Sequence, residues 1–316
     1  MTGAVRVALA AGAGLVVATA VLGQAPPATP APDVTVVSEF VVTAHAGGPA
    51  WWRVSSPHGA VWIMGVPEDL PRGLAWSQSL LRARLKRARE LITDPTVRIG
   101  LGDILPLLRI RGQLRAHGRM EDVLAPDLRA RFLADKAKLT RDPRAYSGWS
   151  PLIAGLLMVS DFRREAGLET REPDRAIAAL ARRMGVKVIP GGTFRAVDLA
   201  RTAAASQGAA GQACLADALD EIESGADRAR AAAQGWARGD VAQALTAARG
   251  YDRCLASLSA GTSLGDETAR DAASTIAAAA ELGGDSVAIV DLRTLLSRDG
   301  VLQRLKAQGL QVETPQ

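Results

Sequence analysis

Hydrophobic and polar positions follow two different periods along this chain, and the shorter period comes first. Residues 34–42, 50–56 and 60–65 are rich in β-branched and aromatic side chains, which predicts three strands. The sequence SPHG between the last two segments predicts a hairpin turn, so His58 is expected at an exposed tip.

A helical period begins near Trp76. Apolar residues then recur every three or four positions, which predicts a helix with one apolar stripe made of Leu81, Leu85, Ala88 and Ile92. The other faces of this helix are basic, with Arg82, Arg84, Lys86, Arg87 and Arg89. We interpret the basic run as a solvated face, and contact with anionic lipid or polysaccharide is the alternative.

Most of the remaining chain is also predicted to be helical. The segments are about 104–116, 127–139, 151–166, 174–184, 197–223, 226–235, 240–248, 266–281 and 300–308. Two short apolar runs interrupt them and predict strands, VKVIP at 186–190 and DSVAIVDL at 285–292. A glycine stop at Gly309 precedes a final predicted strand.

Strands at both ends of the chain with helices between them define the expected fold class. The sequence predicts an α+β, mostly helical single domain around a mixed β-sheet built from N-terminal and C-terminal strands. With 48% hydrophobic residues over 316 positions, the chain is long and apolar enough to bury a sizeable core.

The first 33 residues differ from the rest in composition. A short positive start, an apolar run and small residues at Gly23 and Ala25 predict a signal peptide at 1–25, cleaved after Ala25. A retained anchor is the alternative. Residues 26–33 form a proline-rich tether, and 34–316 form the predicted domain. No later segment has the length of a membrane span, so we expect a periplasmic protein in a Gram-negative type of cell.

The two cysteines fit this exported setting. An oxidising compartment allows Cys214 and Cys254 to form a disulfide, and two buried free thiols are the alternative. The net charge of the chain excludes fewer classes of function. Lys and Arg exceed Asp and Glu by 38 to 33, a net charge of +5, which is too modest to indicate a nucleic-acid partner.

Common enzyme motifs do not indicate a function for this chain. Residues 261–265 match the pattern G-x-S-x-G, but a helical segment precedes the serine and all three histidines come before it, so we interpret it as a loop. Phosphate-binding loops, dinucleotide motifs and histidine pairs at zinc spacing are missing from the sequence, so we expect no cofactor. Asp240 in WARGD is interpreted as a helix N-cap.

Three blocks of sequence resemble a known family in their order and spacing. They are AWWRVSSPHGAVWIMGVPEDLPRGLAW, the pair CLADALDEIESG and GWARGD, and VAIVDLRTLLSRDGVLQRLKAQGLQVE. This pattern resembles the TraB/GumN family, which includes the Tiki proteases, over about 48–314. The resemblance implies histidines and acidic residues at strand ends, a set of groups suited to a divalent metal that activates water.

The motif positions of that family carry different residues here. The resemblance places the first glycine at Gly65, the first histidine at Glu68 and the first acidic residue near Asp94. The second acidic position falls near Gly192, and the second histidine position falls at Thr294 or Arg293. Both histidines are therefore replaced in this chain, and we expect no metal.

Two functions follow from the resemblance and these replacements. The first is a pseudoenzyme with a non-catalytic binding or scaffold role in the cell envelope, whose ligand is an unknown peptide, lipid or polysaccharide. The alternative is an altered metal-dependent, protease-like hydrolase that uses Glu68 and Asp94. Both readings place Glu68, Asp94, Gly192 and Thr294 around one pocket at the sheet end.

Overall fold

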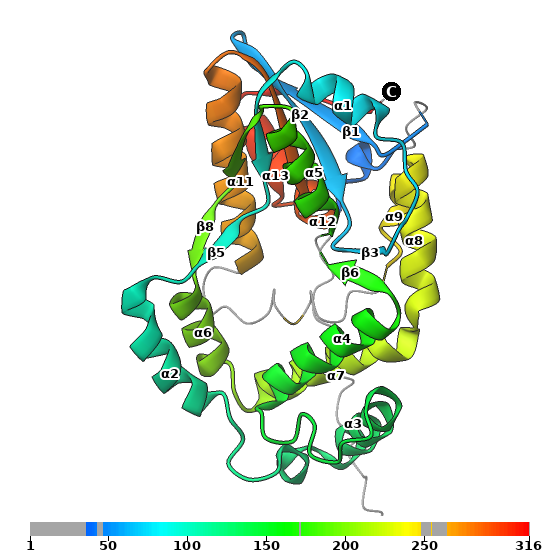
Figure 1. Ribbon diagram of the computed structural model, residues 1–316, viewed down its shortest axis with the longest axis vertical. Coiled ribbons are helices and arrows are strands. Elements are labelled where there is room, and N and C mark those ends of the chain that lie inside the picture. Colours follow the sequence, from blue (N-terminus) through cyan, green and yellow to red (C-terminus); the bar gives the residue numbers. More distant parts are fainter. Residues whose placement is uncertain (1–35, 43–46, 171, 248–253, 255–263, 316) are drawn as a thin grey trace, which may run out of the picture. The chain divides into compact units, whose positions relative to one another are not determined.

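A computed structural model describes residues 36–42, 47–170, 172–247, 254 and 264–315 (Figure 1). The chain from Pro32 to Gln316 forms one compact unit. The predicted signal peptide at 1–25 and the tether at 26–33 lie outside the described residues, as do positions 261–263 of the G-x-S-x-G sequence.

A six-stranded mixed sheet lies at the centre of this unit, in the order β10-β1-β2-β9-β4-β7. Its strands are β1 (Trp51–Ser55), β2 (Gly59–Val66), β4 (Ala88–Thr93), β7 (Lys187–Pro190), β9 (Gly284–Asp291) and β10 (Gln311–Glu313). β1 pairs antiparallel with β2 and β10, whereas β2, β9, β4 and β7 pair in parallel. The predicted α+β class and the sheet built from both ends of the chain are confirmed.

Two small sheets extend from the central one. The first joins β3 (Asp69–Pro71) to β6 (Leu168–Thr170) in antiparallel pairing, and the second joins β5 (Thr96–Arg98) to β8 (Thr193–Arg195) in parallel. Both pairs contain a strand that directly follows a central strand, so they connect the edge of the main sheet to the helices beyond it.

Some helices pack beside the central sheet, and others lie beyond the two small sheets (Figure 1). They are α1 (Ser79–Leu85), α2 (Ile104–Gln113), α3 (Pro126–Leu139), α4 (Pro151–Glu165), α5 (Glu172–Arg183), α6 (Ala196–Ala205), α7 (Ala209–Ser224), α8 (Ala226–Arg238), α9 (Val241–Ala244), α11 (Leu264–Glu281), α12 (Leu292–Leu296) and α13 (Val301–Ala307). One apolar cluster joins the sheet to the helices packed on it, and a second lies among α3, α4 and α7. Within the described part of the chain, every helix is too short or too polar to cross a membrane.

Several local predictions are confirmed. Ser55 pairs with Ala60 across the hairpin between β1 and β2, and His58 is exposed at its tip. Asp240 caps α9, where its carboxylate accepts a hydrogen bond from the backbone N–H of Gln243 at 2.9 Å. Gly309 follows α13 with a positive φ of 87°, a conformation that favours glycine at a helix end.

The strand predicted at 34–42 is wrong for the residues that are described there. Val36 forms an isolated bridge with Ser297, and Ser38–Phe40 form a 3₁₀ turn. The sheet offers no edge beside β1, because β1 already pairs with β2 on one side and β10 on the other. Phe40 is instead buried in the apolar cluster, and only 1% of its surface is exposed.

The helix predicted through Ile92 ends early. α1 stops at Leu85, and residues from Ala88 onward form β4 between β9 and β7. Leu81 and Leu85 are buried on the helix as predicted, but Ile92 is buried in a strand. A three- to four-residue spacing of apolar side chains across a helix-to-strand junction imitated one continuous helical stripe. The predicted helix at 197–223 is likewise divided, and Gly208 with φ of 65° lies between α6 and α7.

The basic run of α1 is not solvated throughout. The guanidinium of Arg84 lies over the rings of Trp51 and Trp62, with its Cζ atom 4.3 Å and 3.8 Å from their centroids. Burial lowers the pKa of Arg84 to about 10. The prediction of a solvated face is therefore wrong at Arg84, because stacking on two indoles stabilises a partly buried guanidinium.

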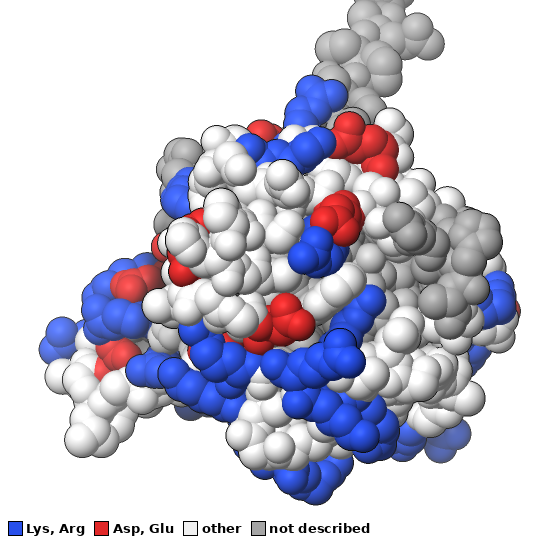
Figure 2. All heavy atoms as spheres, turned by 90° about the horizontal axis from the view of Figure 1, so that it is seen from above, with Lys and Arg blue, Asp and Glu red and all other residues white. Residues whose placement is uncertain are grey.

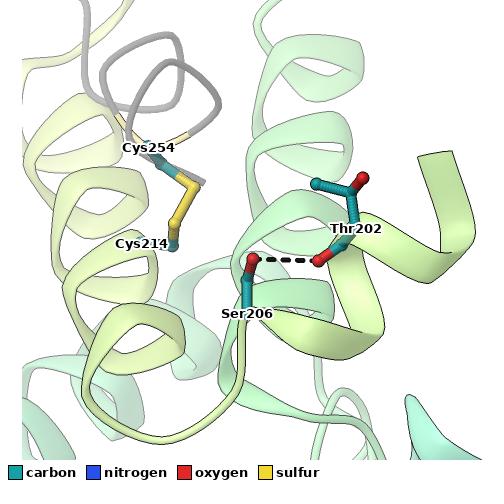
Figure 3. The surroundings of a disulfide bond; sticks show 4 residues. All are labelled: Thr202, Ser206, Cys214 and Cys254. Atoms are coloured by element: carbon teal, nitrogen blue, oxygen red, sulfur yellow. Dashed lines mark hydrogen bonds between the residues drawn. A yellow bond between two sulfur atoms is a disulfide. The ribbon is translucent and has the colours of Figure 1, made fainter. Parts of the chain in front are cut away.

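A disulfide joins Cys214 on α7 to Cys254, and both residues are fully buried in the second apolar cluster (Figure 3). Close packing of α4 on α7 completes this cluster. A Cβ atom added at Gly155 would lie 3.0 Å from the Cβ atom of Ala218, so glycine permits the short distance between the two helices. Nearby, the Ser206 hydroxyl donates to the carbonyl of Thr202 at 2.9 Å.

Positive side chains dominate one face of the surface. Figure 2 shows Lys and Arg gathered in a broad band on this face, while Asp and Glu form smaller, separate groups. The distribution agrees with the net charge of +5 and favours anionic over cationic partners on this face.

Candidate functional site at the carboxyl edge of the sheet

The four central parallel strands end at one edge of the sheet. Val66 at the end of β2 is in register with Asp291 at the end of β9, and Thr93 at the end of β4 is in register with Pro190 at the end of β7. β4 also pairs with β9, which brings the two halves together. Ligands of open α/β sheets collect at such carboxyl ends, so this edge is the candidate site.

All four motif positions follow these strand ends. Glu68 comes two residues after β2, Asp94 one residue after β4, Gly192 two residues after β7 and Thr294 three residues after β9. Their common location at the carboxyl edge is a structural observation. The functional meaning of the replacements at these positions stays a prediction.

Arg163 of α4 is the central charge of the site. Its Nη2 atom lies 2.7 Å from Glu221 Oε1, its Nε atom 2.9 Å from Asp69 Oδ2, and its Nη1 atom 3.5 Å from Glu68 Oε1. Only 10% of the Arg163 side chain is exposed. Burial opposes its charge, but Glu68, Glu221 and Asp69 together outweigh that effect and raise the pKa of Arg163.

A second group of hydrogen bonds links the motif positions that follow β4 and β9. The backbone N–H of Asp291 donates to Asp94 Oδ1 at 3.2 Å, and the Asp291 carboxylate accepts from the backbone N–H of Thr294 at 2.8 Å. Asp291 is thus the N-cap of α12. Burial first, and the negative charge of Glu68 second, raise the pKa of Asp291.

A small cavity of about 50 Å³ opens at this edge. Charged side chains on its wall are Glu68, Asp69, Arg163, Glu221, Asp291 and Arg293. Apolar residues of the wall include Phe162 of α4, Ala229 of α8, Leu292 of α12 and Leu245, which directly follows α9. The cavity is large enough for a water molecule or a single functional group of a ligand.

One of the four motif positions lines the cavity described at this edge. Glu68 lines the cavity, but Asp94, Gly192 and Thr294 are not among its lining residues. Asp94 bonds instead to the backbone of Asp291, and Thr294 lies within the first turn of α12. A Cβ atom at Gly192 would lie 3.0 Å from the Cβ atom of Asp271, so α11 fills the space beside that position.

The divalent metal implied by the family resemblance does not fit these residues. Glu68 is paired with Arg163, Gly192 has no side chain, and Thr294 is neutral. Within the described ranges, the His, Cys, Asp and Glu side chains form no group of three or more that could hold a metal ion. A buried guanidinium supplies the positive charge among the carboxylates of this edge.

Gly65 and α12 form the floor of the site. A Cβ atom at Gly65 would lie 2.5 Å from Leu292 Cδ1 and 3.3 Å from Trp52 Cζ3. The carbonyl of Gly65 accepts a hydrogen bond from the buried indole N–H of Trp236 at 2.7 Å. Arg293 lies next to Asp291 in space, and its Nη2 atom donates to the carbonyls of Leu245 and Ala247 at 2.8 Å each.

Replacement of Gly65 with alanine is expected to destabilise the protein by about 1 to 3 kcal/mol, because the added methyl group overpacks the contact with α12. Gly102→Ala is the matched control, since a Cβ atom there meets nothing within 4 Å. Urea denaturation followed by circular dichroism measures both variants. Equal midpoints for the two variants would show that Gly65 is not sterically required.

Sequence reasoning missed Arg163, Glu221 and Asp291. Arg163 belongs to an ordinary helical segment with neighbouring basic residues, so no local pattern distinguishes it. Asp291 carried a usable signal, because it ends an apolar strand directly before a helix, where a carboxylate caps the first turn.

The fold and the site define a class of protein, an α+β domain with a charged cavity at the carboxyl edge of parallel strands. The model of the TraB/PrgY/gumN family matches residues 50–314, nearly the whole chain, and the chain belongs to this family. Searches of curated proteins and of solved structures found no match.

Proposed function

We propose that this protein is an exported, non-catalytic member of the TraB/PrgY/gumN family that binds a peptide, lipid or polysaccharide ligand in the cell envelope. The supporting observation is the position of Arg163 among Glu68, Asp69 and Glu221 at the carboxyl edge. Carboxylates that neutralise a buried guanidinium are poor ligands for a divalent metal, because the metal would add a second positive charge to the same site.

Metal analysis of the purified protein tests this proposal. We expect far less than one equivalent of Mn, Co, Ni or Zn per chain, and no peptide hydrolysis when these metals are added. Stoichiometric metal together with hydrolysis that Glu68→Gln abolishes would refute the non-catalytic role.

An altered hydrolase that uses Glu68 and Asp94 is the second candidate. One observation favours it, namely the raised pKa of Asp291, which contacts Asp94 and is influenced by Glu68. A raised pKa is the direction of shift that a carboxyl group needs to act as a general acid. Hydrolysis without metal that is lost in Asp291→Asn would support this candidate over the pseudoenzyme.

Export requires its own measurement. We expect the mature chain to begin at or near Pro26, since small residues end the apolar leader and a proline-rich segment follows. The intact mass of protein recovered from the periplasm should lack residues 1–25. A mass that retains Met1, together with fractionation in the membrane, would show a retained anchor.

A further inference from the structure

An exposed apolar surface lies on β5, the following 3₁₀ turn (Leu101–Asp103) and α2, which we name the arm surface. Its members are Val97, Ile99, Leu101, Ile104, Leu105 and Leu108, with 53%, 67%, 91%, 50%, 58% and 59% of their surface exposed. They are six of the ten large hydrophobic residues that are exposed within the described ranges. Such a concentration marks an interaction surface rather than scattered apolar residues.

Packing within the chain does not bury the apolar side chains of the arm surface. α2 packs on α6, and Ile110 is the buried apolar residue of α2. The opposite side of the helix carries Leu105 and Leu108, where a helix on a soluble domain ordinarily has polar residues. The helix is therefore apolar on both sides, and its outer side is available to a partner.

The charges around the arm surface are positive. Arg98, Arg109 and Arg111 are exposed and form no ion pair among the described residues. The nearest acidic residue in sequence, Asp103, is only 4% exposed, and its Oδ1 atom lies 2.5 Å from Arg195 Nη2. The arm surface thus combines apolar side chains with uncompensated arginines, which fits an anionic amphiphilic partner.

The shape and charge of the surface select among partners. Two copies of the chain joined through this surface would collect Arg98, Arg109 and Arg111 of both copies at one interface, and like charges oppose that contact. A peptide helix ordinarily docks in a groove. Residues 96–113 line neither the cavity at the carboxyl edge nor the cavity of about 180 Å³ between α1 and α5. Exposed fractions of half or more show that the apolar side chains project outward.

We propose that the arm surface binds an anionic lipid bilayer. Leu101, Leu105 and Leu108 would insert at the boundary between headgroups and acyl chains, while Arg98, Arg109 and Arg111 would contact anionic headgroups. This inference does not rest on the proposed function of the carboxyl edge, because no residue of the arm surface lines that cavity. It assigns a peripheral membrane contact to a different part of the fold.

Vesicle co-sedimentation tests the proposal with the full chain. Wild type and variants are prepared identically, so any contribution of residues 1–31 is common to all. We expect binding to vesicles of phosphatidylcholine mixed with phosphatidylglycerol, weaker binding at high salt, and little binding to phosphatidylcholine alone. The variant Leu101→Ser/Leu105→Ser/Leu108→Ser should reduce the partition coefficient about tenfold or more.

Charge variants and matched controls separate the two contributions. Arg109→Gln/Arg111→Gln should also reduce partitioning about tenfold or more, since each basic residue near an anionic surface contributes several-fold. Leu282→Ser is the apolar control, because Leu282 is 70% exposed outside the arm surface. Arg141→Gln/Arg228→Gln is the charge control, with the same change in net charge at two exposed arginines elsewhere. Both controls should bind as wild type does.

Each result of the vesicle experiment either supports or overturns the proposal. Loss of binding in the arm variants with unchanged controls supports the proposal. Absence of binding to anionic vesicles at low salt overturns it, as does equal binding by the arm variants and wild type. Equal binding to neutral vesicles also overturns the anionic preference. Sedimentation velocity completes the test, because a dimer that dissociates in the leucine variant would assign the arm surface to a second copy of the chain.

Discussion

Replacement of Arg163 with methionine is expected to destabilise the protein by about 3 to 5 kcal/mol, because it removes the positive charge from a buried carboxylate cluster. The exposed fractions of the Glu221 and Asp69 side chains are only 8% and 15%, so water does not replace the lost guanidinium. Equilibrium urea denaturation followed by circular dichroism gives the free energy of unfolding.

The next residue provides the control for Arg163→Met. Arg164 is 69% exposed on the same helix and pairs with Asp161 at 2.6 Å, so Arg164→Met should change stability by less than about 0.5 kcal/mol. Similar stability of the two variants at neutral pH would show that Arg163 does not hold the site together.

Removal of the disulfide is expected to cost about 4 kcal/mol, because the link closes a long loop in the unfolded chain. The two cysteines are 40 positions apart and fully buried, so Cys214→Ala/Cys254→Ala also removes two packed sulfur atoms. Thermal and urea denaturation measure the loss, and alkylation of the native protein without reductant should label neither cysteine.

Reductant serves as the control for this pair. Dithiothreitol should lower the stability of the wild type toward that of the double alanine variant and leave the variant unchanged. Full alkylation of the fresh native protein, or a wild type whose unfolding is insensitive to reductant, would contradict a closed disulfide in the purified protein.

The sequence was informative about the sheet where apolar runs were short and clearly bounded. Turn residues flank β1, β2, β7 and β9, and the hairpin is rich in β-branched and aromatic residues, so these strands were predicted close to their observed bounds. The prediction for the β4 segment was wrong because Ala88 and Ile92 continue the apolar spacing of α1. Only the pairing with β9 and β7 decides that this segment forms a strand. Contacts with the neighbouring strands therefore override the local helical pattern of this segment.

The candidate site was predicted less completely than the fold. The motif positions lie at one edge because their strands are parallel, and that outcome followed from the family resemblance rather than from local pattern. The ion pairs of Arg163 could not be predicted, since they join α4, α7 and the loop after β2 over separations of 58 and 95 positions. Nothing in the sequence near Arg163 indicates burial or partners.

A guanidinium lies among the carboxylates of the carboxyl edge, and we propose that this edge lacks the ligands for a catalytic metal. Thermal denaturation with added Mn²⁺, Co²⁺ or Zn²⁺ tests it most directly. A metal present at 100 times its Kd would stabilise a site by about 2.7 kcal/mol, which corresponds to a Tm increase of about 4 to 8 °C. We expect shifts below about 1 °C for wild type and for Glu68→Gln alike, because Thr294 is neutral and Gly192 provides no donor. An increase of several degrees in the wild type that disappears in Glu68→Gln would contradict the claim and favour a metal-dependent hydrolase.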